Sequence, residues 1–200
     1  MHTTLDLIRH GEPVGGRRYR GQTDDPLSEK GWAQMWAAVG DYAQWQHIVS
    51  SPLSRCQAFA DALAEKRGIP LSIEARFKEV SFGTWEGHTA AQLTADHPDL
   101  LFDFKCDPLQ HRPDGAEPLA DFHARVMAGW QAVLDAHAGQ HVLVVCHAGV
   151  IRMLLAQVLG MRLENVYRIQ VGSAAISRIT VEQRHGRRLA TLQFHDGVLS

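Results

Sequence analysis

The chain has 200 residues, of which 45% are hydrophobic and 21% are charged, a composition typical of one soluble globular domain with a sizeable core. A formal net charge of −2, without any run of like charges, gives no field for a nucleic-acid backbone, so we expect no nucleic-acid partner. No segment reaches the ~20 apolar residues that cross a bilayer and no basic, apolar leader follows Met1, so we expect a cytoplasmic protein without a membrane contact.

The first elements alternate between strand and helix. Residues 4–9 predict a short buried strand, and the stretch 11–26, rich in Gly, Arg and Asp, predicts an irregular loop beside the end of that strand. Ser28 is a suitable N-cap for a helix over residues 29–44, whose apolar residues recur at helical spacing. An apolar pair at 48–49 predicts a second strand.

A second helix follows this strand. Ser51 is the expected N-cap and Pro52 the first helical position of a helix that runs to about Arg67. Residues 71–87 are broken by glycines and predict strand and loop. Prolines recur through residues 88–118, so we expect short helices and loops inserted over one face of the sheet, as a lid-like segment and not a second domain.

The remainder predicts a helix over 119–137, a strand that ends at His147, a helix from about 150 to 159, and two strands within 174–194. Alternating strands and helices favour an α/β fold, a three-layer α/β/α sandwich around a mostly parallel sheet. We expect a single domain over residues 1–200. The three cysteines are odd in number and not closely paired, which favours reduced thiols over a disulfide framework or a thiolate zinc site.

Two apolar runs end in the same way, each passing from a strand pattern into a histidine and a nearby glycine. The first ends in Arg9-His10-Gly11, and the second ends in His147 with Gly149 close behind. Because the carboxyl ends of strands in an open α/β sheet face a common crevice, we expect the two imidazoles to meet at one site. The rigid, planar guanidinium group of Arg9 can bind an oxyanion through several N–H donors, so the expected ligand is a phosphate.

Three further expectations concern the chemistry of this site. Arg55 is expected in the first turn of its helix, where the macrodipole disfavours a cation, and a bound anion would explain that placement better than an arginine pointing into solvent. Two guanidinium groups near His10 would lower its pKa and keep the imidazole neutral for attack on phosphorus, forming a phosphohistidine that water hydrolyses. Glu79 is the best carboxylate candidate for protonating the leaving oxygen. The alternatives are packing roles for the histidines and a solvated loop position for Glu79.

Five segments, in this order along the chain, resemble the histidine phosphatase superfamily, also called phosphoglycerate-mutase-like. They are residues 7–12, 20–31, 50–56, 79–87 and 145–150. The opening Arg-His-Gly is the signature of the family, and the resemblance spans nearly the whole chain.

The resemblance implies catalytic or substrate-binding roles for particular residues of this chain. They are the phosphoryl acceptor His10, the phosphate-binding Arg9 and Arg55, the proton donor Glu79, the transition-state-stabilising His147, and Gln22 and Thr23 at positions from which relatives touch phosphate. The implied substrate is a small-molecule phosphomonoester. No metal and no cofactor is implied, and the chain is expected to be a monomer or a homodimer.

Within the superfamily, residues 82–87 and the tail after His147 look most like the α-ribazole phosphatases of cobalamin biosynthesis, which remove the 5′-phosphate of α-ribazole phosphate. Many relatives have an asparagine in the loop after the signature, where this chain has none, so Arg17 or Arg18 is expected to replace that contact. Trp85 is expected to pack in the core or rim, or to form an aromatic wall for a benzimidazole-like base.

Four other functions stay open. A broad-specificity small-molecule phosphatase would share the same motifs. A phosphoglycerate mutase would return the phosphoryl group to its substrate, although this chain is shorter than typical mutases. A non-catalytic phospho-ligand binding module would bind phosphate without turnover, and a metal-dependent hydrolase built from the histidines would lose activity with a chelator.

Overall fold

The computed structural model describes residues 2–199, which form one six-stranded mixed sheet in the order β3-β2-β4-β1-β5-β6. The strands are β1 His2–Arg9, β2 His47–Ser50, β3 Leu71–Ile73, β4 His141–Cys146, β5 Ile176–Arg184 and β6 Arg187–Gly197. The first four are mutually parallel, whereas β5 pairs antiparallel to both β1 and β6. The C-terminal hairpin therefore extends a parallel sheet at one edge.

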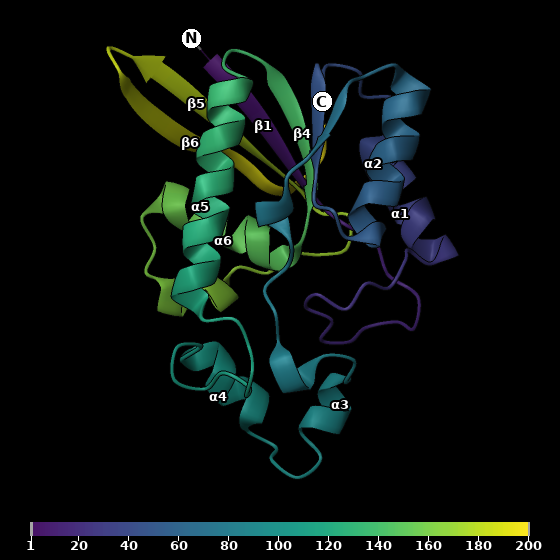
Figure 1. Cartoon of the computed structure of the whole chain (residues 1–200), viewed down its shortest axis with the longest axis vertical. Coiled ribbons are helices and arrows are strands. Elements are labelled where there is room, and N and C mark those ends of the chain that lie inside the picture. The colour runs from purple at the N-terminus through teal and green to yellow at the C-terminus, as the bar shows by residue number, and fades with distance from the viewer. Residues whose placement is uncertain (1, 200) are drawn as a thin grey trace.

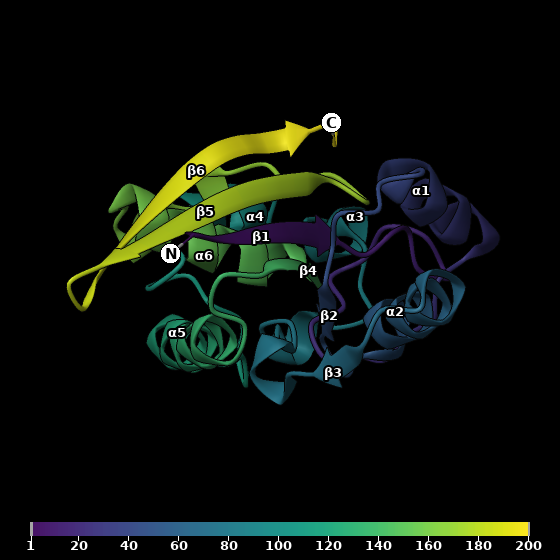
Figure 2. The same ribbon diagram turned by 90° about the horizontal axis from the view of Figure 1, so that it is seen from above.

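Helices cover both faces of this sheet. The helices α1 Glu29–Val39 and α2 Ser54–Arg67 lie on one face, and α5 Leu119–Ala136 and α6 Ala148–Leu159 lie on the other, as Figure 2 shows. Two separate hydrophobic clusters fill the spaces between sheet and helices. The expected three-layer α/β/α sandwich around a mostly parallel sheet is confirmed.

The central strands explain why both faces are covered. In β4, Val142 and Val144 join the cluster under α5 and α6, whereas Leu143 and Val145 join the cluster under α1 and α2. Successive side chains of a strand point to opposite faces, so a run that is apolar at every position must be buried on both sides. This burial places the histidine after β4 at the end of a rigid, fully enclosed strand.

Two helix boundaries differ from the expectation. The first helix ends at Val39 and not at residue 44, because Gly40 stops it and Tyr42 turns inward to receive a hydrogen bond from Arg178 of β5. The second helix begins at Ser54 and not at Pro52, with Leu53 as its N-cap residue. Leu53 has no side-chain acceptor, and Asp24 accepts the N–H of Ser54 at 2.7 Å in its place.

Short elements occupy the connections near the carboxyl ends of the strands. Residues 71–87 hold β3 and two 3-10 helices, η1 Ala75–Phe77 and η2 Gly83–Trp85, in agreement with the expected strand and loop. The segment 88–118 holds α3 Ala90–Leu93 and α4 Leu100–Cys106, which lie beyond the carboxyl end of β1 in Figure 1. A further 3-10 helix, η3 Leu163–Arg168, precedes β5. Within residues 2–199, the helices are all too short or too polar to span a bilayer.

Candidate active site

The register of the parallel strands brings three chain segments to one edge of the sheet. Arg9 lies opposite Cys146 and Ser50 opposite Val145, so the residues that follow these strands emerge side by side. The N–H of His10 donates to the carbonyl of Cys146 at 3.0 Å, which carries the pairing one residue past the strand. The rings of His10 and His147 consequently lie 5.2 Å apart, centroid to centroid, in an edge-on arrangement. The expected meeting of the two imidazoles is observed.

Among the described residues, one ring nitrogen of His10 is hydrogen-bonded to protein and the other has no protein partner. Its Nδ1 lies 2.7 Å from the carbonyl oxygen of Gly11, an acceptor, so this nitrogen carries a proton and Nε2 carries the lone pair. The side chain is buried, and burial, followed by the positive charges of Arg55 and Arg9, holds its pKa well below the ordinary value of 6.5. A neutral imidazole with a free lone pair is a nucleophile.

His147 is fixed by a residue that the sequence analysis assigned elsewhere. The hydroxyl of Ser51 lies 2.7 Å from Nε2 of His147 and accepts the N–H of Leu53 at 3.3 Å. Ser51 therefore does not cap the helix as expected, since its hydroxyl orients the imidazole. Burial, then the charge of Arg55, the neighbouring imidazole of His10 and the charge of Arg9, hold the pKa of His147 well below 6.5. The sulfur of Cys56 lies 3.8 Å from Nδ1 of His147 and 3.6 Å from Nε2, so the ring is held from this side as well.

Of the two arginines of the site, Arg55 is buried and Arg9 is half-buried, and both are incompletely paired. Arg55 is 1% exposed, and its Nη1 and Nη2 donate to the carbonyls of Thr23 and Gly21 at 2.8 and 2.7 Å. Arg9 donates from Nη1 to the carbonyl of Val171 at 2.7 Å, and burial lowers its pKa to about 10. Within residues 2–199, Nε of each side chain has no partner. Buried donors without acceptors are costly, so both arginines are prepared for an anion.

The structure thus excludes the solvent-pointing alternative for Arg55. It also supplies part of the reason for a cation in the first turn of α2, because the two loop carbonyls accept its donors. Nε of Arg55 has no partner among the described residues and can donate a hydrogen bond to an oxyanion.

Glu79 reaches the site from the loop after η1 and is only 8% exposed. Its Oε2 accepts the N–H of Gly149 at 3.1 Å, in the first turn of α6, and its Oε1 accepts the N–H of Val80 at 3.0 Å. Its backbone carbonyl accepts from Arg125 of α5 at 3.0 Å and from Gln22 at 3.3 Å. Glu79 is therefore not the solvated loop residue of the alternative interpretation, and no pattern in the sequence indicated the contact with Arg125.

Gly149 leaves the room that this carboxylate occupies. A Cβ at this position would lie 2.1 Å from Oε1 of Glu79 and 3.2 Å from the ring of Phe122. We expect Gly149→Ala to displace the carboxylate and to lower kcat by about 100-fold, the cost of a misplacement of about 1 Å. The fold should survive, because alanine favours a helix over glycine by about 1 kcal/mol. Steady-state kinetics beside thermal unfolding checks this, and a normal kcat would contradict the placement of Glu79.

Gln22 and Thr23 lie at the site, but their side chains are engaged by protein. Gln22 donates from its amide to the backbone of Glu79, and the hydroxyl of Thr23 donates to Oε2 of Glu86 at 2.8 Å. Glu86 also accepts from the backbone N–H groups of Gln22, Thr23 and Phe82 and from the hydroxyl of Ser81. Burial opposes its charge, yet these hydrogen bonds outweigh burial and lower the pKa of Glu86. Glu86 organises the loop that carries the partners of Arg55, a role that the sequence did not indicate.

The loop arginines differ in their engagement. Arg18 donates to the carbonyls of Gly15 and Gly87 at 3.0 and 3.2 Å and so fastens the loop. Arg17 is exposed, and its charge lies near enough to Arg9 to contribute to lowering the pKa of Arg9. Of the two, Arg17 is therefore better placed to stand in for the missing asparagine.

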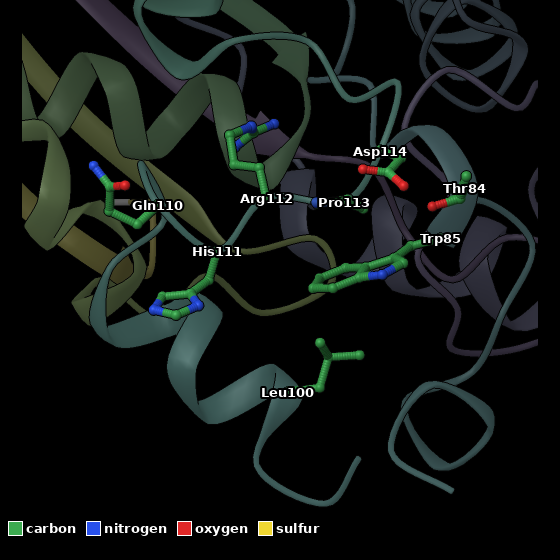
Figure 3. Close-up of a pocket in the computed structure, with 8 residues that line it drawn as sticks. All are labelled: Thr84, Trp85, Leu100, Gln110, His111, Arg112, Pro113 and Asp114. Atoms are coloured by element: carbon green, nitrogen blue, oxygen red, sulfur yellow. The ribbon is translucent and has the colours of Figure 1, made fainter. Parts of the chain in front are cut away.

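Trp85 lies beside the site and packs mainly as a core residue. It is 7% exposed and meets Tyr19 and Phe104 edge-on, at 5.5 and 5.1 Å between ring centroids. One edge of its ring faces a cavity of about 370 Å³, shown in Figure 3. Leu100 lines the opposite wall of this cavity. Packing accounts for the buried face of Trp85, and a ligand could touch only the exposed edge.

Comparison with known proteins agrees with this arrangement. The family model described as "Histidine phosphatase superfamily (branch 1)" matches residues 5–193. Phosphoserine phosphatase 1 of Hydrogenobacter thermophilus is 30% identical over 187 residues, which cover 90% of this chain and 87% of that protein. The chain spans about half of three mycobacterial relatives that it matches at 34% identity, 49% of their length.

Solved structures give the same result for the fold. A mycobacterial glucosyl-3-phosphoglycerate phosphatase superposes with a TM-score of 0.85 at 28% identity, covering 96% of this chain and 97% of that one. A candidate alpha-ribazole-5′-P phosphatase of Escherichia coli superposes with a TM-score of 0.78 at 27% identity, covering 98% and 96%. With the match over residues 5–193, these similarities show that the chain belongs to the histidine phosphatase superfamily, branch 1.

Proposed function

We propose that the protein is a phosphomonoesterase that works through a phosphohistidine on His10. The observation that carries the proposal is the state of this imidazole, whose Nδ1 is committed to Gly11 while Nε2 stays free beside two incompletely paired arginines. Nε2 attacks phosphorus, the ester oxygen leaves with a proton, and water then releases inorganic phosphate from the histidine. Splitting the displacement in this way replaces one difficult step with two easier ones.

Each neighbour of His10 has a role in this proposal. Arg9 and Arg55 hold the equatorial phosphoryl oxygens and stabilise the charge that develops on them. His147, held by Ser51 next to His10, stabilises the same oxygens in the transition state. Glu79 protonates the leaving oxygen, and Arg17 adds a cation at the loop. The side chains of Gln22 and Thr23 are engaged by protein, so they contribute mainly by shaping the loop that carries the partners of Arg55.

The proposed substrate is a small-molecule phosphomonoester, and α-ribazole 5′-phosphate is one candidate. The sequence resemblance and the similarity to the Escherichia coli protein support it. Phosphorylated acids are the second candidate class, supported by the names of the phosphoserine phosphatase and the glucosyl-3-phosphoglycerate phosphatase and by two further arginines near Glu79. We also propose that residues 88–118 act as a lid and that the protein works in the cytoplasm, as a monomer or a homodimer.

A phosphate-release screen with a chelator present tests this function. We expect inorganic phosphate from at least one of the α-ribazole, phosphoserine and phosphoglycerate esters, and undiminished activity in EDTA. Isomerisation of 3-phosphoglycerate would instead indicate a mutase. Phosphate binding without turnover would indicate a binding module, and loss of activity in EDTA would indicate a metal-dependent hydrolase. Any of these last three results would overturn the proposal.

The pH dependence of the free enzyme follows from the lowered pKa of His10. The neutral imidazole is the reactive form, so activity is lost as the pH falls through its pKa, and we expect the acid limb of kcat/KM to lie below pH 6.5. Because cations lower this pKa, Arg55→Gln should move the limb to higher pH, whereas Arg55→Lys should not. The measurement is kcat/KM against pH with an aryl phosphate whose own ionisation is titrated separately. A limb above pH 6.5, or one that stays in place in Arg55→Gln, would contradict the account.

A further inference from the structure

Two arginines outside the set discussed above lie near Glu79. Arg112 comes from the segment 88–118 and donates from Nη2 to the carbonyl of Ser81, two residues past Glu79, at 3.4 Å. Arg152 is on α6, three residues after the glycine whose N–H binds the Glu79 carboxylate. Residues three apart on a helix are neighbours on one face. The charges of both guanidinium groups and of Glu79 act on the side chain of Tyr167, so these four side chains lie close together.

Arg112 is half-buried and incompletely paired. Within the described chain its Nε and Nη1 are covered and have no acceptor, and its hydrogen bond to Ser81 is long. Arg112 is one of the residues that line the cavity beside Trp85 and Leu100, and Figure 3 shows its side chain turned away from these two side chains. A guanidinium group whose covered N–H donors have no acceptor is destabilising unless a bound anion supplies the acceptors.

Arg152 is positioned by contacts with protein that leave part of its guanidinium group available to a ligand. Its Nε donates to the carbonyl of Ile169 at 2.9 Å, and its guanidinium carbon lies 5.2 Å from the centre of the Tyr167 ring. Hydrogen bonding from Arg112 also reaches the Tyr167 side chain, so this tyrosine lies between the two arginines. Burial raises the pKa of Tyr167 to about 12, which keeps its hydroxyl a donor.

These cations form no ion pair within the described residues, although the charge of Glu79 raises the pKa of Arg9. Among residues 2–199, none of the ion pairs involves Arg9, Arg55, Arg112 or Arg152. Like charges held together in a partly buried space repel one another, and the repulsion from Arg152 contributes to lowering the pKa of Arg9. Arg9 and Arg55 suffice to hold one phosphoryl group, so the other two cations are in excess of what that group needs.

We propose that Arg112 and Arg152, with the hydroxyl of Tyr167, form a subsite for a second anionic group, a carboxylate on the alcohol that leaves. This inference rests on the proposed function, because Glu79 must face the leaving oxygen for the two arginines to face the rest of the leaving group. The substrate class is then a phosphorylated hydroxy acid or hydroxyamino acid. The leaving group of α-ribazole phosphate is an uncharged nucleoside, which would leave the subsite empty and make that ester the weaker substrate.

Matched ester pairs that differ only in the carboxylate test the subsite. One pair is phosphoserine and phosphoethanolamine, and the other is 3-phosphoglycerate and glycerol 3-phosphate. We expect the wild-type kcat/KM to favour the carboxylate of each pair by at least about 10-fold, equivalent to about 1.4 kcal/mol. Arg112→Gln should lower this ratio by about 10-fold, and Arg112→Lys should restore part of it. Arg168→Gln, at an exposed arginine next to Tyr167, is the control that should leave the ratio unchanged.

The possible outcomes distinguish a failure of the proposed subsite from a failure of the proposed function. Hydrolysis of all four esters without a preference for the carboxylate, or the same loss on both members of a pair in Arg112→Gln, would overturn the subsite and leave the phosphomonoesterase standing. A higher kcat/KM for α-ribazole phosphate than for either carboxylate ester would overturn it as well. Release of phosphate from no ester at all would overturn the proposed function itself. Thermal unfolding of each variant distinguishes a lost subsite from a lost fold.

Discussion

Replacing His10 by alanine is expected to lower kcat/KM for any phosphomonoester by at least about 1,000-fold, because the variant loses the atom that attacks phosphorus. The structure gives the replacement little else to disturb. Within residues 2–199 the imidazole makes one hydrogen bond to protein, to the carbonyl of the next residue, and alanine is smaller than the side chain that it replaces. Phosphate binding should largely persist, because the arginines that hold the anion remain. The measurement is steady-state kinetics together with calorimetric titration of inorganic phosphate.

His97→Ala is the matched control, since this histidine is exposed and its imidazole is not part of the site. It should retain wild-type activity. A His10→Ala variant that kept more than about 1% of the activity would show that water attacks phosphorus directly, and the covalent mechanism would have to be abandoned.

Replacing Glu79 by glutamine is expected to lower kcat by a factor that depends on the leaving group. A glutamine has the shape of the carboxylate but no proton to give, so kcat on an alkyl phosphate should fall by about 100- to 10,000-fold, the usual contribution of a general acid. On p-nitrophenyl phosphate, whose phenolate leaves without a proton, kcat should fall by about 10-fold or less. The comparison of the two esters in one variant removes any common effect on folding or phosphate binding.

Glu65→Gln serves as the control, because Glu65 is exposed on α2. Equal losses of kcat on both esters in Glu79→Gln would mean that the carboxylate only shapes the pocket. The proton would then have to come from another group.

The sheet could be predicted from sequence because its central strands are buried on both faces. A run such as residues 142–146 is apolar at every position, and the glycines at 68 and 160 mark where helices end in the left-handed conformation. These signals are local. The meeting of His10 and His147 could also be predicted, since parallel strands end at the same edge of a sheet.

The contacts that hold the site in shape could not be predicted, because their partners lie far apart in the chain. Ser51 before Pro52 has the pattern of a helix cap, yet Asp24 accepts the N–H at the helix start from 30 residues away and Ser51 turns to His147. Glu86 gathers N–H groups from two separate loops, and nothing in its neighbouring residues indicates this. A local pattern records what a residue can do, and the tertiary fold decides which partner it meets.

The substrate could be predicted only as far as its phosphate. The residues that contact the phosphoryl group sit in short, recognisable motifs, whereas Arg112 and Arg152 come from an irregular segment and from the middle of a helix. Their relation to Glu79 appears only when the chain is folded.

The most direct test of the central claim is to trap the phosphorylated enzyme. During turnover of p-nitrophenyl phosphate, quenching into alkali preserves phosphohistidine, and mass spectrometry of the digested protein locates the added phosphoryl group. We predict a phosphoryl group on the peptide that contains His10, present in Glu79→Gln as well and absent in His10→Ala. Rapid turnover with no phosphoryl group on that peptide, or with the group on His147 instead, would contradict the account.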